Sequence, residues 1–167
     1  MKQSPISSRS WHIARWPLLA WLETIIKLAA LSIGIMAGVN ALSVGSFTLP
    51  TGLQLVQFAI LLLLSLGLIA AIFDRIADRE IIAMIFVVVN NLGHWGMLLG
   101  LATGCDYLLW FAGLMLLGDL VKVGFIRIHN FTVRDYAPQI LYILTLFYVG
   151  GYTLLILLEW IRLLVTS

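Results

Sequence analysis

A few polar and charged side chains lie inside long apolar stretches of this sequence, and they are the residues that could do chemistry. Asn90, Asn91 and His94 lie close together in one stretch, and Asp119 lies in the next. On a helix that turns about 100° per residue, both asparagines lie within about 60° of His94. Amide, imidazole and carboxylate groups gathered in this way could hold a ligand, an ion or a proton, since histidine titrates near neutral pH.

We therefore predict one buried polar cluster, formed by Asn90, Asn91, His94, Asp119 and Tyr148. The prediction depends on a hairpin, because the short turn between the stretches that hold His94 and Asp119 indicates that these two helices pack side by side. The alternative interpretation is structural. The asparagines and His94 would then make interhelical hydrogen bonds worth about 0.6–2 kcal/mol each, and Asp119 would pair with Lys122, three residues along the same helix.

Small residues recur at helical spacing in two of the apolar stretches. One row consists of Ala30, Gly34 and Gly38, and a second consists of Gly93, Gly96, Gly100 and Gly104. Such rows let another helix backbone approach closely, which matters in lipid because helices associate there through van der Waals packing. We predict that these rows pack helices within one bundle, with a self-association face or a narrow pore lining as the alternatives.

No motif in the sequence points to catalysis, a metal or a cofactor. It contains no glycine-rich phosphate loop, no nucleophile elbow and no His-Glu-x-x-His zinc motif. The single Cys105 excludes an internal disulfide and a cysteine metal cage. Asp74 and Asp78 are four residues apart, but arginines alternate with them, so we interpret this stretch as a solvated loop. We predict no catalytic residue, no metal site and no cofactor.

These polar residues are set in a strongly apolar chain. Of its 167 residues, 62% are hydrophobic and 11% are charged, whereas about 25% of the residues in soluble domains are charged. A membrane-spanning helix needs ~20 apolar residues. The apolar stretches predict an all-α bundle of five transmembrane helices, at residues 17–41, 54–73, 81–102, 107–126 and 138–164. Residues 17–167 would form this single domain, after a cytoplasmic or interfacial arm at residues 1–16.

Basic residues gather at alternate ends of the predicted helices. Those on one side are Lys2, Arg9, Arg15, Arg75, Arg79, Arg127 and Arg134. The two connections on the other side contain no Lys or Arg. The positive-inside rule therefore places the N-terminus in the cytoplasm and the C-terminus outside a cell membrane, which is the inner membrane if the source is bacterial.

The start of the chain has two interpretations. Trp11, Trp16 and Trp21 would anchor the arm at the membrane surface, where tryptophan is enriched. Alternatively, a signal peptide could end near Ala41. We favour the anchor, because the apolar stretch is longer than the usual ~7–15 residues of a signal peptide.

Three functions from different classes remain open. The first is a non-catalytic subunit, assembly or scaffold component of a membrane complex, with the lipid bilayer, other membrane proteins or further copies of the chain as partners. The second is a small oligomeric transporter or channel that uses Asn90, His94 and Asp119. The third, an intramembrane enzyme, ranks last because no catalytic constellation exists. Nucleic acid is excluded as a partner, since the sequence has no basic run.

Overall fold

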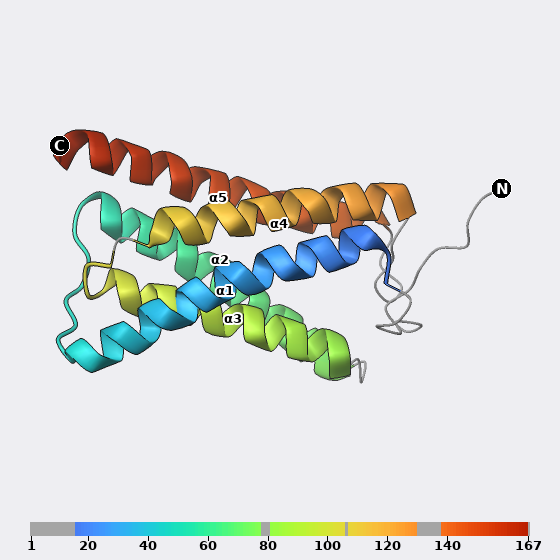
Figure 1. The fold of residues 1–167 in the computed structure, drawn as a ribbon, viewed down its shortest axis with the longest axis horizontal. Helices are drawn as coiled ribbons and strands as arrows, with labels where there is room; N and C mark the ends of the chain where they lie inside the picture. The colour runs from blue at the N-terminus through green and yellow to red at the C-terminus, as the bar shows by residue number, and fades with distance from the viewer. Residues whose placement is uncertain (1–15, 78–80, 106, 130–137, 167) are drawn as a thin grey trace.

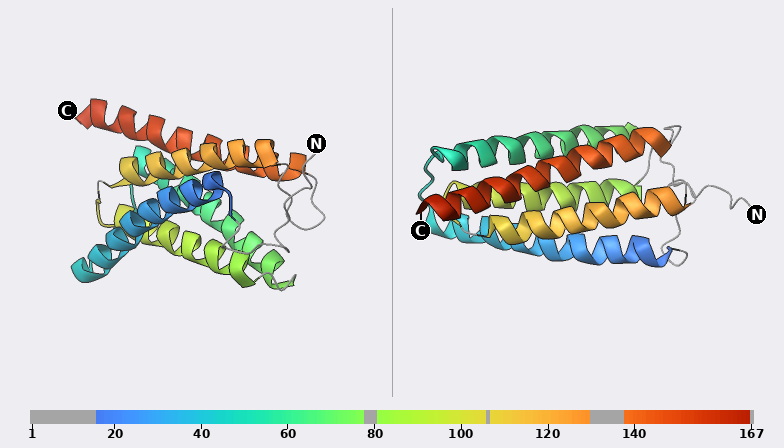
Figure 2. Two further views of the ribbon diagram at one scale, coloured as in Figure 1. Left: turned by 45° about the vertical axis from the view of Figure 1, so that its right-hand side comes forward. Right: turned by 90° about the horizontal axis from the view of Figure 1, so that it is seen from above.

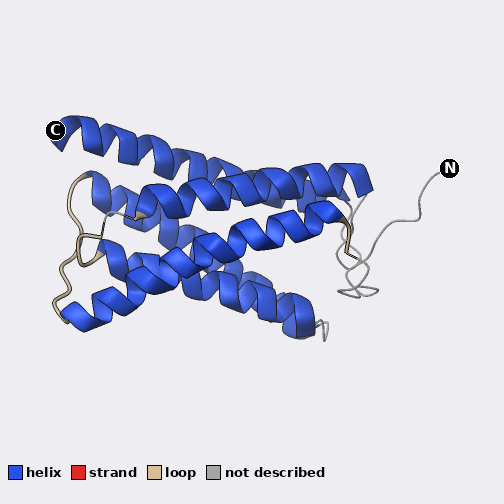
Figure 3. Cartoon of the chain, in the orientation of Figure 1, coloured by secondary structure: helices blue, strands red, loops and turns tan. Residues whose placement is uncertain are grey.

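The computed structural model of the chain describes residues 16–77, 81–105, 107–129 and 138–166, and it is helical apart from the connections (Figure 3). The helices are α1 (Leu18–Val44), α2 (Leu53–Ala77), α3 (Ile81–Leu101), α4 (Leu108–His129) and α5 (Pro138–Thr166). These described ranges contain no strand. The predicted all-α class is confirmed, and all five helices are long and apolar enough to cross a membrane.

The predicted helix ranges differ little from the observed ones. The largest difference lies in α2, which was expected to end at residue 73 and continues to Ala77. The prediction ended the helix where the apolar run ends, at Asp74. Charged residues stop a membrane-spanning stretch, but they do not stop a helix whose end lies in water.

The five helices form a closed ring in cross-section. α1 packs against α3 and α4, α2 packs against α3 and α5, and α4 packs against α5. The order around the ring is therefore α1, α3, α2, α5, α4. Figures 1 and 2 show the helices running alternately along the long axis, with the C-terminus at the end of the bundle opposite the start of α1.

The contact between α1 and α3 is built from the two glycine rows. A Cβ atom added to Gly34 would overlap the carbonyl oxygen of Gly93, and one added to Gly38 would lie 2.7 Å from the Cα atom of Gly96. Glycine at these positions therefore lets the two backbones touch. Ala30 is fully buried in the same region.

The second row does not pack along its whole length. Gly100 continues it, because an added Cβ atom would lie 2.9 Å from that of Ala37. Gly104 was expected to belong to this row and does not, since it has open space around it and a φ angle of 79°. It lies in the turn after α3, where this left-handed backbone conformation suits glycine.

The expected hairpin of the third and fourth helices is wrong. α3 and α4 follow each other closely in the chain, but they contact each other only briefly. α1 packs against both of them instead. The reason is the close approach of α1 to α3, which places α1 beside α3 in the ring and leaves the opposite side of α1 for α4.

Side chains fill the centre of the ring. His94, Met97, Phe111 and Tyr152 are fully buried, and they come from α3, α4 and α5. The outside is apolar on every helix, with large exposed side chains such as Leu28, Leu63, Ile85, Leu120 and Leu157. A surface of this kind suits lipid rather than water.

Trp16 lies at the start of α1, where the sequence predicts an aromatic anchor. Its ring is buried, and the ring centroids of Trp21 and Phe86 lie 5.3 Å and 5.5 Å away. Trp21 is partly exposed and can serve as an anchor. Residues 1–15 of the predicted arm lie outside the described residues, and so does Asp78 of the charged stretch.

Candidate functional site

Lys27 joins α1 to α4 through a buried ion pair. Its Nζ atom donates hydrogen bonds to Asp119 Oδ1 at 2.6 Å and to Glu23 Oε1 at 2.8 Å. Lys27 is able to reach α4 because its alkyl chain crosses Gly118, where an added Cβ atom would lie 2.8 Å from Lys27 Cγ. We call Glu23, Lys27 and Asp119 the charged triad.

Asp119 therefore has a different environment from the one expected. Sequence analysis considered Lys122, on the same helix, as its partner, whereas this ion pair is made by Lys27 from another helix. The i, i+4 spacing of Glu23 and Lys27 indicates that these two side chains can pair, and they do. Nothing in the spacing shows which helix receives the second hydrogen bond of Lys27.

His94 bridges α3 and α5 in the centre of the ring. Its Nδ1 atom lies 2.8 Å from the carbonyl oxygen of Asn90, and its Nε2 atom lies 2.6 Å from the hydroxyl of Tyr152. Because a carbonyl can only accept, Nδ1 carries the proton of the neutral ring. Nε2 then accepts a hydrogen bond from Tyr152. Phe111 of α4 closes the site, with its ring edge-to-face on the imidazole at 5.2 Å between centroids.

The other predicted cluster residues hold further pairs of helices together. Asn91 Oδ1 accepts a hydrogen bond at 2.6 Å from Ser65 on α2. The Tyr148 hydroxyl donates a longer bond, 3.3 Å, to the carbonyl oxygen of Leu64, also on α2. Asn90 Oδ1 is buried and has no hydrogen-bond partner among the described residues.

The structure thus brings together part of the predicted set and adds two residues to it. Tyr152 contacts His94 through the hydrogen bond described above and Tyr148 at 6.3 Å between ring centroids, and Asp119 pairs with Lys27. We call these five residues the mid-bundle cluster. Asn91 bonds to α2 instead. Lys27 and Tyr152 were not predicted as cluster members, although Tyr152 lies four residues after Tyr148, on the same helix face.

A second group of polar side chains, which was not predicted as a group, lies nearer the C-terminal end of α5. Gln57 on α2 donates a hydrogen bond to Glu159 Oε2 at 2.8 Å, and Arg162 holds both carboxylate oxygens of Glu159 at 2.9 Å and 2.6 Å. Gln57 and Glu159 are buried. The Glu159 carboxylate is paired with the Arg162 guanidinium on the same helix, and its hydrogen bond from Gln57 holds α5 against α2.

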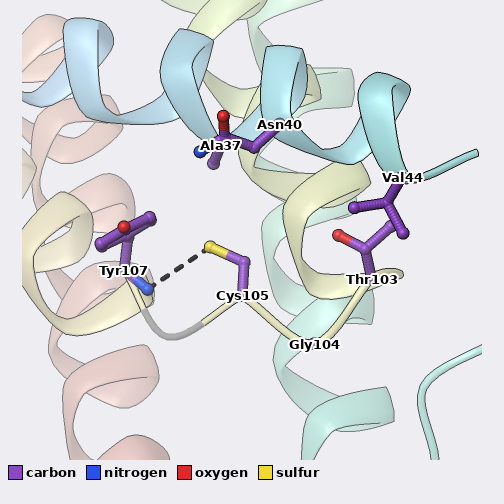
Figure 4. A pocket seen from close by; sticks show the side chains of 7 residues that line it. All are labelled: Ala37, Asn40, Val44, Thr103, Gly104, Cys105 and Tyr107. Carbon is purple, nitrogen blue, oxygen red and sulfur yellow. Dashed lines mark hydrogen bonds between the residues drawn. The ribbon is translucent and has the colours of Figure 1, made fainter.

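A cleft of about 420 Å³ lies at the same end of the bundle, between α1 and the turn that joins α3 to α4 (Figure 4). Asn40, Thr103 and Tyr107 supply polar groups, and the Sγ atom of Cys105 accepts a hydrogen bond from the backbone N–H of Tyr107 at 3.4 Å. None of the described residues that line the cleft is charged. Within the described ranges, no three His, Cys, Asp or Glu side chains gather to hold a metal ion.

Removing the Tyr152 hydroxyl should weaken the bundle measurably. We expect Tyr152→Phe to lower the free energy of unfolding by about 1–2 kcal/mol, because His94 Nε2 is left buried without a donor. Reversible unfolding in mixed micelles would measure the change. Tyr148→Phe is the matched control and should cost less, since its hydroxyl bond is long and its side chain is only half-buried. An equal loss in both variants would contradict this account of His94.

Fold and site together define an all-α bundle of five membrane-length helices, closed into a ring around a buried polar cluster. Comparisons with protein families, with curated proteins and with solved structures gave no match for this chain.

Proposed function

We propose that the chain is a multi-pass membrane protein of the cell membrane, the inner membrane if its source is bacterial, with its N-terminus in the cytoplasm. The apolar outer surface of all five helices supports insertion in lipid. The basic residues of the sequence support the orientation, because they gather at alternate ends of the apolar stretches.

The lone cysteine provides a direct test of this orientation. Cys105 lies in the turn that the proposal places outside, and its side chain is partly exposed. A membrane-impermeant thiol reagent added to intact cells should label it. In a Cys105→Ser background, a cysteine at the exposed position Arg127 should be labelled only after the membrane is opened. The reverse pattern would overturn the orientation.

Within the membrane, we propose a non-catalytic role as a subunit, assembly or scaffold component of a larger complex. The observation that carries this proposal is that the buried polar groups form hydrogen bonds between helices. Lys27, Asn91, His94 and Glu159 each form a hydrogen bond with another helix, and each joins a different pair of helices. Polar groups committed in this way stabilise one arrangement of helices, and buried side chains such as Met97, Phe111 and Tyr152 fill the centre of the ring.

Purification from its native membrane would test this role. A tagged chain expressed at its natural level should migrate in mild detergent as part of a larger complex, with partners identified by mass spectrometry. Lys27→Met, which disrupts the bundle, should lose those partners, whereas the surface variant Arg127→Met should keep them. Isolation of the chain alone, at natural expression and in several mild detergents, would count against the proposal.

A second candidate function, transport by an oligomer, is favoured by one observation. Asp119 Oδ2 is buried without a hydrogen-bond partner among the described residues, and an uncommitted carboxylate oxygen inside a membrane is a functional signal. Ion or solute flux into proteoliposomes that Asp119→Asn abolishes would support transport. Absence of flux under both ion and proton gradients would leave the subunit role as the better explanation.

A further inference from the structure

α1 changes its neighbour along its length. In its first half it lies against α4, where Lys27 crosses Gly118, and in its second half it lies against α3, where Gly38 meets Gly96. α1 and α4 therefore diverge toward the end of α1, as Figure 1 shows. The cleft of about 420 Å³ lies at this end of the bundle (Figure 4). All the described residues that line it belong to α1 or to the turn between α3 and α4, and none belongs to the body of α4.

Exposed aromatic residues mark the depth of this cleft in the membrane. Tyr107 lines the cleft, and Trp110 follows about one helical turn later, with exposed fractions of 47% and 69%. Tyrosine and tryptophan are enriched where the hydrocarbon of a bilayer meets its polar region. Phe47 and Leu49, in the loop beyond α1, are also exposed, which suits lipid rather than water. Asn40 lies four residues before the end of α1, about 6 Å below it along the axis. The cleft therefore opens at the depth of the glycerol and ester groups of the lipids.

The cleft combines available hydrogen-bond donors with an apolar wall. Among the described residues, Asn40 and Tyr107 form hydrogen bonds only through backbone atoms. The Asn40 amide, with two N–H donors, and the Tyr107 hydroxyl, with one O–H donor, are therefore available to a ligand. The hydroxyl of Thr103, by contrast, donates to a carbonyl oxygen of α3 at 3.0 Å. Ala37 and Val44 supply the apolar wall. Such a surface matches an ester carbonyl that continues into an acyl chain.

The charges of the sequence exclude recognition of a phosphate group by a basic side chain of the cleft. No lysine or arginine occurs in residues 28–74 or 80–121, which include every residue that lines the cleft. The turn itself contains one charged residue, Asp106, which lies outside the described residues. Arg162, at the same end of α5, pairs with Glu159. A neutral acceptor is therefore the part of a lipid that this cleft can recognise, and its volume lies in the usual range of ligand sites, about 300–1,000 Å³.

We propose that this cleft is a binding site for the glycerol–ester region of a membrane lipid. An ester carbonyl accepts hydrogen bonds from the Asn40 amide and the Tyr107 hydroxyl, and the acyl chain continues between the diverging parts of α1 and α4. The inference rests on insertion of the bundle in lipid. It is independent of the subunit role and of which face of the membrane this end of the bundle occupies.

Native mass spectrometry of the purified protein tests the proposal without any variant. Protein in mild detergent is titrated with dioleoyl phosphatidylcholine, or with the diether lipid that has the same headgroup but no ester carbonyl. One molecule of the diester lipid should be retained, and the diether lipid should bind about tenfold more weakly, as the loss of one or two hydrogen bonds predicts. Equal binding of the two lipids would overturn the proposal. So would tighter binding of dioleoyl phosphatidylglycerol, which would indicate recognition by charge, or a lipid-free dimer, which would assign the cleft to a second copy.

Variants test the two proposed donors. The double variant Asn40→Leu with Tyr107→Phe should bind the diester and diether lipids equally, because no donor remains to distinguish them. Ser32→Ala with Tyr142→Phe is the matched control and should keep the preference for the diester. Ser32 is exposed on α1 and donates to its own helix, and Tyr142 lies near the start of α5, at the opposite end of the bundle. Loss of the preference in the control, or its persistence in the first double variant, would contradict the assignment of the donors.

Cross-linking separates failure of this site from failure of membrane insertion. A phosphatidylcholine with a photoreactive diazirine close to its ester group, in liposomes that contain the protein, should cross-link mainly to peptides with residues 37–44 or 103–107. An excess of unlabelled diester lipid should suppress this product. Cross-links spread evenly over all five helices would overturn the lipid site and leave insertion intact, whereas absence of any cross-link would contradict insertion itself.

Discussion

Replacing Lys27 with methionine is expected to lower the free energy of unfolding by about 3–5 kcal/mol, the usual cost of removing one partner from a buried ion pair. The substitution keeps most of the volume of the alkyl chain that crosses Gly118. It removes the only ammonium that contacts Asp119 and Glu23 in the described structure. The buried carboxyl of Asp119 and the half-buried carboxyl of Glu23 then lose the ammonium that they share, and α1 loses its polar link to α4.

Unfolding in mixed micelles, followed by far-ultraviolet circular dichroism, would measure this loss. Arg127→Met is the control, because Arg127 is exposed near the end of α4 and surface substitutions usually change stability by about 0.5 kcal/mol or less. A double variant, Lys27→Met with Asp119→Leu, should recover much of the stability, since it removes the buried carboxyl as well. A loss of less than about 1 kcal/mol in Lys27→Met would mean that the triad does not stabilise the bundle.

Replacing Gly34 with alanine is expected to cost about 3 kcal/mol, near the upper end for overpacking of a close-packed interior. The added Cβ atom would overlap the carbonyl oxygen of Gly93, which belongs to a helix backbone and cannot rotate away. α1 and α3 would have to separate along their whole contact. The helix-forming preference of alanine offsets at most about 1 kcal/mol of this cost.

Gly113→Ala provides a matched control for this prediction. Gly113 is also helical, but its added Cβ atom would meet nothing within 4 Å. The control should therefore be neutral or slightly stabilising in the same unfolding assay. If Gly34→Ala proved as stable as Gly113→Ala, the close contact between α1 and α3 would be wrong.

Sequence patterns predicted the helices well, because each one depends on its own run of apolar residues. They could not predict which helices are neighbours. That order depends on the fit between backbones, here the approach of Gly34 and Gly38 to Gly93 and Gly96. The expected hairpin of α3 and α4 failed for this reason.

The residue types of the candidate site were visible in the sequence, but their partners were not. His94, Asp119 and Tyr148 were expected to meet one another, whereas their hydrogen bonds are made with Tyr152, Lys27 and the carbonyl oxygen of Leu64. Lys27 lies far from Asp119 in the sequence, and a lysine near the start of a spanning helix usually indicates an interfacial residue that extends its ammonium toward water. Only the position of α1 against α4 turns it inward.

The order of helices in the ring has a consequence for how the chain reaches its final form. α2 with α3 and α4 with α5 are the pairs of consecutive helices that pack closely, so each pair can dock as soon as it has been synthesised. α1 is made first, but both of its neighbours come later. Its contacts with α3 and α4 can form only after those helices have been synthesised. α1 then packs between the α2–α3 hairpin and the α4–α5 hairpin. Among the five helices described, the one that is synthesised first is therefore the last to complete its contacts.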